Sequence, residues 1–399
     1  MHNIRKINND LYYIGVSDRK LALFENVYPI PRGVSYNSYV LLDEKTVLLD
    51  TVDAAVGGQF LENLKYALNG RQLDYLVVNH MEPDHCALLE DVVLRWPEVK
   101  IVTNAKAAGM IRQFFDFELD SRLMQVAEGD TLSTGRHTLH FAMAPMVHWP
   151  EVMVTYDELD KVIFSADAFG TFGALNGNIY ADEVNFDRDW LDDARRYLVN
   201  IVGKYGPQIQ ALLKKAAGLD IQMICPLHGP IWRENLGYYI EKYDKWSKYE
   251  AEENGVLIVY GSVYGHTEVV ASVLANKLAE RGVKGIAMYD ASHTDVSELV
   301  SEAFKYSNIV VAAPTYNGDI YTPVETWLTD LKHHNLQNRK WSLIENGTWA
   351  AMSGKQMRAM IEGMKNMTFV GDTMTVKSAM KSCQEDALNQ LADEIVKSL

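Results

Sequence analysis

The chain has 399 residues, a length typical of two or three domains rather than of one small module. Apolar residues make up 48% of it and charged residues 23%, an ordinary globular composition that argues against extensive disorder. The excess of 53 Asp and Glu over 38 Lys and Arg gives a net charge of −15, which disfavours nucleic acid and anionic membrane surfaces as partners.

The N-terminus has no continuous apolar stretch behind its basic residues, and no run of about 18 apolar residues occurs, so the sequence predicts neither a secretory signal nor a membrane span. The three cysteines, Cys86, Cys225 and Cys383, form no CxxC pair, which disfavours a disulfide framework and an all-thiolate metal site. We therefore expect a soluble, cytoplasmic protein.

The chain up to about residue 230 alternates short apolar runs with amphipathic segments. The runs predict strands at Tyr39–Leu42, Thr46–Leu49, Tyr75–Val78, Ile101–Thr103, Thr138–Met143 and Val162–Ser165. Apolar positions at helical spacing predict helices at Gly57–Asn69, His85–Trp96, Ala105–Phe115, Trp190–Leu198, Ile209–Ala217 and Leu236–Tyr249. Residues 250–255 have no apolar periodicity, so we expect one domain at residues 1–250 and a second at residues 251–399.

The second domain is expected to alternate strands and helices regularly. Strands are predicted at Val256–Tyr260, Gly285–Tyr289, Ile309–Ala313, Trp341–Ile344 and Thr368–Val370. Helices are predicted at Glu268–Arg281, Val296–Ala303, Val324–Leu331, Lys355–Met364 and Gln384–Ser398. Five strands alternating with five helices indicate the α/β class, with right-handed crossovers and a doubly wound parallel sheet.

Potential metal ligands are densest in the segment HMEPDH, residues 80–85, directly after a predicted strand. In α/β sheets, ligands gather beyond the carboxyl ends of strands. We expect His80, Glu82 and Asp84 to project to one side of an extended segment and His85 to open the next helix, so that all four reach one cavity.

Three further strand ends supply the same chemistry: His148 lies between two prolines, Asp167 follows an apolar strand, and His228 lies in a turn held by proline and glycine. Seven ligands are too many for one tetrahedral ion but suit two metals that share a carboxylate. His137 and His140 lie an odd number of residues apart on one predicted strand, face opposite sides, and are expected to be structural.

The order HxExDH, then His, Asp and His, resembles the metallo-β-lactamase fold, an αββα sandwich. The hydrolases of that fold carry HxHxDH, and here Glu82 stands where their second histidine would be. Additional carboxylate oxygens shift the preference from zinc toward redox-capable ions such as iron. The substitution therefore favours electron transfer over hydrolysis.

A second motif follows the predicted strand Val256–Tyr260. The loop GSVYGHTE offers the hydroxyls of Ser262, Tyr264 and Thr267, together with backbone N–H groups at a helix start, to an anion. It is neither a GxGxxG turn nor a nucleoside triphosphate loop, and it has no lysine. A phosphate monoester is the ligand that fits best.

This loop resembles the phosphate loop of flavodoxins, in which Ser262, Gly265 and Thr267 match the pattern and Tyr264 departs from a hydroxyl position. Two later loops, after the third and fourth strands, correspond to those that flank the isoalloxazine ring in that family. Tyr316 and Trp349 are expected to border the ring. The implied FMN site consists of Ser262, Val263, Tyr264, Gly265, His266, Thr267, Pro314, Thr315, Tyr316, Asn317, Gly347, Thr348 and Trp349.

Together, the two halves resemble the flavodiiron proteins over essentially the whole chain. The resemblance implies the catalytic metal ligands: one iron at His80, Glu82 and His148, a second at Asp84, His85 and His228, and Asp167 as the bridge. It also implies reduction of O2 to water, of NO to nitrous oxide, or of both, with electrons that pass through FMN.

The implied assembly is a head-to-tail homodimer or a dimer of dimers. Because no rubredoxin-like module follows residue 399, the chain resembles the shortest class, in which a separate donor such as rubredoxin supplies the electrons.

Two alternatives stay open at this stage. One is a zinc metallohydrolase fused to a flavodoxin domain, which the carboxylate at Glu82 disfavours. The other is a non-enzymatic flavin electron carrier whose first domain is a scaffold, which seven intact ligands disfavour.

Overall fold

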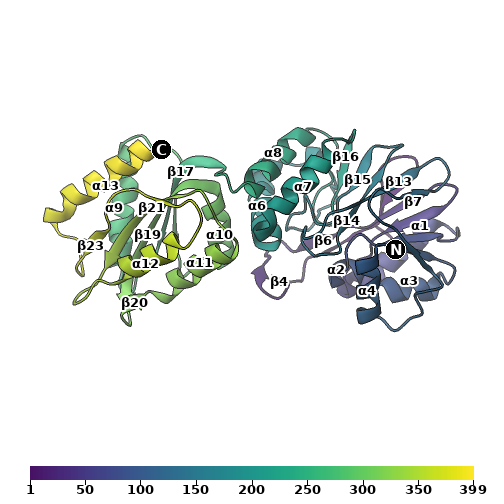
Figure 1. Ribbon diagram of the computed structural model, residues 1–399, viewed down its shortest axis with the longest axis horizontal. Coiled ribbons are helices and arrows are strands. Elements are labelled where there is room, and N and C mark those ends of the chain that lie inside the picture. The colour runs from purple at the N-terminus through teal and green to yellow at the C-terminus, as the bar shows by residue number, and fades with distance from the viewer. The chain divides into compact units, whose positions relative to one another are not determined.

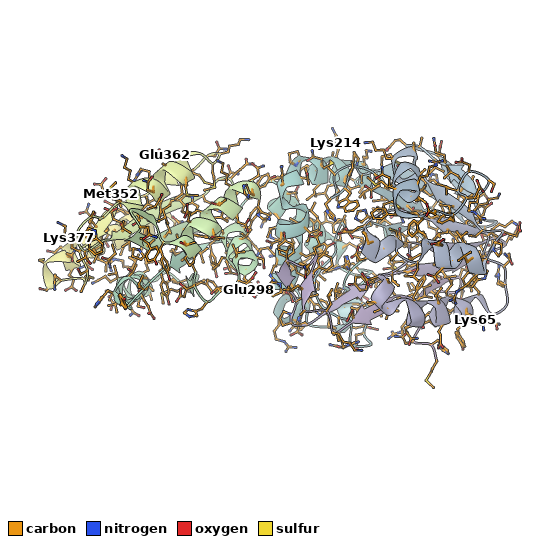
Figure 2. The ribbon with its side chains drawn as sticks, turned by 90° about the horizontal axis from the view of Figure 1, so that it is seen from below. Lys65, Lys214, Glu298, Met352, Glu362 and Lys377 are labelled. Atoms are coloured by element: carbon orange, nitrogen blue, oxygen red, sulfur yellow. The ribbon has the colours of Figure 1, made fainter.

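The computed structural model describes residues 1–399 and divides into two compact units, Met1–Tyr243 and Asp244–Leu399 (Figure 1). The domain boundary expected after residue 250 falls within the second of these units. None of the helices combines the length and the apolar character that crossing a bilayer requires. Charged side chains such as Lys65, Lys214 and Glu362 project from the surface (Figure 2).

The first unit contains two sheets. The seven-stranded sheet has the order β1-β2-β7-β8-β9-β10-β11 and the five-stranded sheet the order β12-β13-β14-β15-β16. The first comprises β1 (Arg5–Lys6), β2 (Leu11–Tyr13), β7 (Tyr39–Leu42), β8 (Thr46–Leu49), β9 (Tyr75–Val77), β10 (Lys100–Thr103) and β11 (Leu123–Gln125). The second comprises β12 (Thr131–Ser133), β13 (Thr138–Met143), β14 (Met153–Asp157), β15 (Val162–Phe164) and β16 (Met223–Cys225). Two short pairs complete the unit: β3 (Val16–Asp18) with β6 (Val34–Tyr36), and β4 (Leu23–Phe24) with β5 (Tyr28–Pro29).

Helices flank these sheets on both sides, which makes the unit an αββα sandwich (Figure 1). On one side lie α1 (Gly57–Leu68), α2 (Pro83–Cys86), α3 (Leu89–Arg95) and α4 (Ala105–Phe114). On the other lie α6 (Leu191–Tyr197), α7 (Gly206–Ala216) and α8 (Leu236–Ser247), and the short α5 (Phe186–Asp189) precedes them. The expected helix His85–Trp96 is two helices, and the remaining short turns are Ala54–Val56, Ala181–Glu183, Leu198–Val202 and Gly203–Tyr205.

Local sequence explains where these elements begin and end. Asn104 starts α4 by accepting hydrogen bonds from the backbone N–H groups of Lys106 and Ala107. Asn69 ends α1 in the left-handed conformation, at φ 46°. The apolar run of β8 is buried on both faces, as expected for a central strand that helices cover.

The second unit is a parallel sheet in the order β18-β17-β19-β21-β22, the flavodoxin-like 2-1-3-4-5 arrangement. Its strands are β17 (Glu253–Tyr260), β18 (Ile286–Asp290), β19 (Tyr306–Tyr316), β20 (Asp319–Ile320), β21 (Lys340–Asn346), β22 (Thr368–Phe369) and β23 (Met374–Val376). Its helices are α9 (His266–Glu280), α10 (Val296–Lys305), α11 (Thr322–His333), α12 (Ser353–Glu362) and α13 (Glu385–Ser398), with a short turn at Ser382–Gln384. The fifth strand expected at residues 368–370 is divided, because β22 and β23 each pair with a different part of β21.

Candidate functional site

All seven predicted metal ligands lie where strands of the first unit end, and the structure brings them together. His80 and Glu82 follow β9, and Asp84 and His85 lie in α2. The other three follow β13, β15 and β16, and they are His148, Asp167 and His228. Because these strands belong to both sheets, the site forms at one end of the sandwich.

The segment from His80 to His85 differs from the expectation in one respect. The sequence predicts an extended stretch through Asp84, whereas α2 begins at Pro83. Proline suits the first helical position because its φ is fixed and it has no N–H to satisfy. The turn separates the ligands: His80 and Glu82 face one group, and Asp84 and His85 face another.

The first group consists of His80, Glu82, His148 and one oxygen of Asp167. Nε2 of His148 lies 3.0 Å from Oε2 of Glu82 and 3.1 Å from Oδ2 of Asp167. Nε2 of His80 lies 3.3 Å and 3.2 Å from the same two oxygens. Two atoms bound at about 2.1 Å to one octahedral ion lie about 3.0 Å apart, so this spacing is that of a coordination shell.

The second group consists of Asp84, His85 and His228, and Asp167 joins it to the first. The Nε2 atoms of His85 and His228 lie 3.0 Å apart, and each lies 3.3 Å from Oδ2 of Asp84. Oδ1 of Asp167 lies 3.3 Å from Nε2 of His85 and 3.7 Å from Nε2 of His228. The two oxygens of one carboxylate therefore face the two groups, which is the geometry of a bridging ligand.

The carboxylates at the centre of this cluster are buried with imidazoles as their only ion-pair partners. Both side-chain oxygens of Asp84 and both of Asp167 lack a hydrogen-bond partner. Removing an ionised carboxylate from water is costly unless a cation or hydrogen bonds offset the loss. Cations between the two groups would offset it, and a mixed set of imidazole nitrogens and carboxylate oxygens suits iron or zinc. The residues thus fit a two-metal centre.

Burial dominates the pKa shifts of two of the ligands, His228 and Asp84. It lowers the pKa of His228, which keeps the imidazole in the neutral form that binds metals. It raises the pKa of Asp84 to about 7, against the opposing effect of His85.

Some residues hydrogen-bond to the metal ligands, or to their backbone, on the side that faces away from the cluster. These residues were not identified from the sequence. Nδ1 of His228 donates to the backbone oxygen of Ser35 at 2.7 Å, and Nδ1 of His80 lies 2.8 Å from Oε1 of Glu151. Asp50 accepts hydrogen bonds from the backbone and side chain of Asn79, next to His80. Asn79 and Glu151 are close in the chain to the predicted ligands His80 and His148, but no motif marks them, and Ser35 and Asp50 lie far from any ligand in the sequence.

A third group, His137, Asp157 and Asp160, also has residue types that hold metals. Nδ1 of His137 lies 2.8 Å from Oδ2 of Asp157, and Nε2 lies 3.4 Å from Oδ2 of Asp10. Arg136 donates to the same oxygen of Asp10 at 2.6 Å. Existing ion pairs therefore balance Asp157 and Asp10, and Asn8 donates to Asp160 at 2.6 Å, which fits the structural role expected for His137.

A pocket of about 600 Å³ in the second unit collects the residues expected to hold FMN. All of them line it except Gly265, which shapes the loop between β17 and α9 at φ 86° and donates its N–H to Oγ of Ser262. The lining also includes residues that were not predicted: Gly318, Asn346, Ala350 and Ser378. Trp349 and Tyr264 are 93% and 89% exposed.

Asn346 ties the loops of this pocket together. Its side-chain nitrogen donates to Oγ1 of Thr267 at 3.3 Å, and its side-chain oxygen accepts from the backbone N–H of Ser378 at 3.0 Å. No lysine or arginine lines the pocket, so hydroxyls and the N-terminus of α9 supply its anion-binding groups. A phosphate monoester with a planar ring fits such a pocket.

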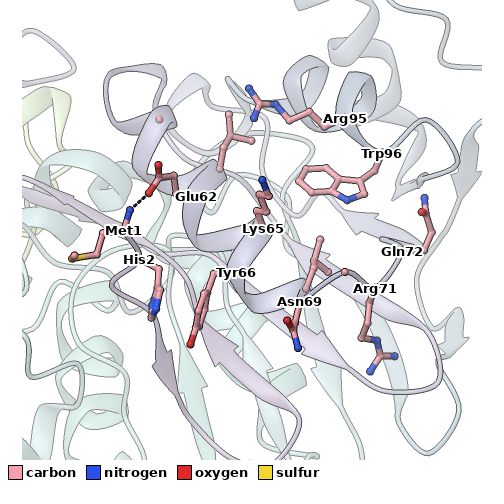
Figure 3. Close-up of a pocket in the computed structure, with 14 residues that line it drawn as sticks. Met1, His2, Glu62, Lys65, Tyr66, Asn69, Arg71, Gln72, Arg95 and Trp96 are labelled. Carbon is pink, nitrogen blue, oxygen red and sulfur yellow. Dashed lines mark hydrogen bonds and ion pairs between the residues drawn. The ribbon is translucent and has the colours of Figure 1, made fainter.

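A further cavity, of about 880 Å³, lies along α1 and the end of α3 (Figure 3). Lys65, Arg95 and Trp96 border it, and Glu62 forms an ion pair with the amino group of Met1 at its edge. It lies apart from the metal and FMN residues, since none of them lines it.

Comparisons with known proteins match both units. A family model described as ODP family beta lactamase matches residues 34–229, and one described as flavodoxin domain matches residues 257–375. An uncharacterised protein of Methanocaldococcus jannaschii is 32% identical over 82% of this chain and 81% of its own length. The anaerobic nitric oxide reductase flavorubredoxin of Escherichia coli K12 is 27% identical over 95% of this chain and 80% of its own.

The solved structures agree with the sequence relatives. Rubredoxin oxygen:oxidoreductase of Desulfovibrio gigas is similar to this chain with a TM-score of 0.90 and 28% identity. The match covers 99% of this chain and 98% of the other. The likeness therefore includes both units and the order in which they follow each other.

Proposed function

Because the chain belongs to the flavodiiron protein family, we propose that it is an oxidoreductase that reduces dioxygen to water, nitric oxide to nitrous oxide, or both. The relatives support both substrates, since one is named an oxygen oxidoreductase and another a nitric oxide reductase. The reaction belongs to the first unit, where the seven ligands meet.

One observation carries this proposal: the carboxylate of Asp167 lies between two ligand groups and presents one oxygen to each. We assign one iron to His80, Glu82 and His148, a second to Asp84, His85 and His228, and the bridge to Asp167. Two iron ions held by these residues would supply electrons to a diatomic substrate. The ligands keep both positions buried, which limits the access of bulk water.

The second unit supplies the FMN site. Hydroxyls of Ser262 and Thr267 and the start of α9 bind the phosphate, and the loops at residues 314–317 and 347–349 hold the ring. Asn346 keeps these loops in register through its contacts with Thr267 and Ser378. FMN held there would relay electrons from an external donor, and we propose a rubredoxin or a similar small protein as that donor.

We further propose a head-to-tail homodimer, or a dimer of dimers, as the working unit. In that arrangement the FMN of one chain serves the metal centre of its partner. The net charge of −15 disfavours long-range attraction to an acidic donor, so the donor docks through local contacts.

Metal analysis separates this proposal from a zinc hydrolase. Protein produced in iron-replete medium is expected to contain about two iron ions per chain and little zinc. Stoichiometric zinc with little iron would contradict the diiron assignment. FMN, and not FAD, is expected on denaturation, because the pocket offers one phosphate-binding loop.

Activity separates the proposal from an electron carrier. A Glu82→Ala, Asp84→Ala double variant is expected to lose more than about 100-fold in O2 and NO consumption by the reduced protein, because each metal loses a ligand. A Glu158→Ala, Asp160→Ala variant is the matched control, with the same residue types at the same spacing outside the site. Equal rates for wild type and the first variant would favour the carrier.

A further inference from the structure

Three of the four imidazoles in the metal cluster have remote nitrogens with different surroundings. With Nε2 turned into the cluster, Nδ1 of His80 carries the hydrogen and donates to Oε1 of Glu151 at 2.8 Å. Nδ1 of His228 donates to a neutral backbone oxygen, that of Ser35. Nδ1 of His85 is buried and has no partner. Among these three histidines, only His80 donates the hydrogen of its remote nitrogen to a carboxylate.

Glu151 is held firmly in this place. Its Oε1 also accepts the backbone N–H of Met81 at 2.9 Å, and its backbone oxygen accepts from Nδ2 of Asn104 at 2.6 Å. The residue is 1% exposed, so water does not screen its charge. The side chain therefore has one orientation, aimed at the back of His80.

The charge of Glu151 has no counter-ion of its own. No lysine or arginine forms an ion pair with it, and its second oxygen, Oε2, is buried without a hydrogen bond. A buried anion of this kind persists only where a nearby cation offsets the lost hydration. The available cation is a metal ion on the far side of the His80 ring, with which the carboxylate interacts through the imidazole.

We propose that Glu151 is a positioning residue that makes the two metal positions inequivalent, because its carboxylate strengthens His80 as an electron donor to the ion at His80, Glu82 and His148. This inference rests on the proposed diiron function and adds an order of events to it. The ion at His80, Glu82 and His148 is bound more tightly than the other ion. It is also the first to be oxidised when the reduced centre loses one electron. The ion at Asp84, His85 and His228, whose histidines lack an anionic partner, stays reduced longer.

The variants Glu151→Gln and Glu151→Ala test the proposal. Glutamine keeps the shape and an acceptor oxygen but removes the charge, and alanine removes both. Titration of the metal-free protein with Fe²⁺ is expected to show one of the two ions bound about tenfold more weakly in E151Q, with the other unchanged. Stepwise oxidation followed by Mössbauer and electron paramagnetic resonance spectroscopy is expected to show a smaller yield of the one-electron-oxidised state.

Asp157→Asn is the matched control, because Asp157 contacts Nδ1 of the buried His137 at the same 2.8 Å outside the metal site. It is expected to change neither iron affinity nor the oxidation pattern. If E151Q keeps both wild-type iron affinities and the wild-type oxidation pattern, or if D157N alters them as much, the positioning role is refuted while the diiron function stands. If wild-type protein fails to bind two iron ions, the proposed function and this inference both fall.

Discussion

A single buried histidine illustrates how residues outside the metal site hold the first unit together. His137 is fully buried between Asp157 and Asp10, and Arg136 pairs with Asp10 from the outside. Burial lowers the pKa of His137, but the hydrogen bond and charge of Asp157, with Asp160 and Asp10 nearby, outweigh it and raise the pKa. The imidazolium is therefore a folded-state partner of these carboxylates.

Because the pKa of His137 is higher in the folded chain, its contribution to stability is complete below the unfolded value of about 6.5 and is lost as pH rises through the folded value. A His137→Gln variant should be less stable than wild type by about 2 kcal/mol at pH 5.5, and the deficit should shrink as pH rises. Urea unfolding from pH 5.5 to 9 measures it. His140→Gln, three residues away on β13 and partly exposed, should lie within about 0.5 kcal/mol of wild type at every pH. A deficit that grows with pH would contradict the ion pair.

Helix α9 has a glycine with positive φ beyond each end, and only one of the two lies at the flavin site. Gly265 precedes the helix at φ 86° and Gly282 follows it at φ 88°, and a Cβ at either would meet no atom within 4 Å. Alanine at each position therefore carries the same left-handed strain, about 1–2 kcal/mol, without a clash. Only Gly265 shapes the phosphate loop, through its N–H bond to Ser262.

We expect Gly265→Ala to weaken FMN binding about tenfold and Gly282→Ala to leave it unchanged, while both lower the thermal midpoint. Fluorescence titration of the FMN-free protein with FMN measures the affinity. Similar dissociation constants for the two variants would show that the loop does not depend on this backbone conformation.

Periodicity predicted the regular elements well and the irregular ones poorly. The central strands β8, β9 and β19 were predicted because they contain consecutive apolar residues, and the helices α1 and α4 because their apolar residues recur at helical spacing. Strand β14, MVTYD, was not predicted: it is buried at every position between β13 and β15, but Thr155 and Asp157 interrupt its apolar pattern. The ligand motifs predicted the metal cluster, but Glu151 and Asn346 act through partners far away in the chain, which no local spacing encodes.

At the scale of the whole molecule, the proposed head-to-tail dimer predicts complementation between two inactive chains. One chain carries Gly265→Ala with Thr267→Ala and lacks FMN, and the other carries Glu82→Ala with Asp84→Ala and lacks the metal centre. Mixed dimers contain one intact FMN facing one intact metal centre, so an equal mixture, after exchange of subunits, should recover about a quarter of the wild-type rate.

The outcome distinguishes transfer between chains from transfer within one chain. If the flavin served the metal centre of its own chain, mixing would restore no activity. Each variant alone provides the baseline, and light scattering of the mixture confirms that dimers persist.

The exposed Trp349 ring should give the protein a distinct component of tryptophan fluorescence. Of the eight tryptophans, it is the one that lies largely in water, at 93% exposure, and it borders the flavin pocket. Its emission should lie at longer wavelength than that of buried indoles such as Trp246, Trp327 and Trp341, and red-edge excitation should select it. A flavin bound beside the ring would quench this component by energy transfer. The fluorescence of Trp349 thus reports, without an added label, whether FMN is bound. A Trp349→Phe chain should lack this long-wavelength emission.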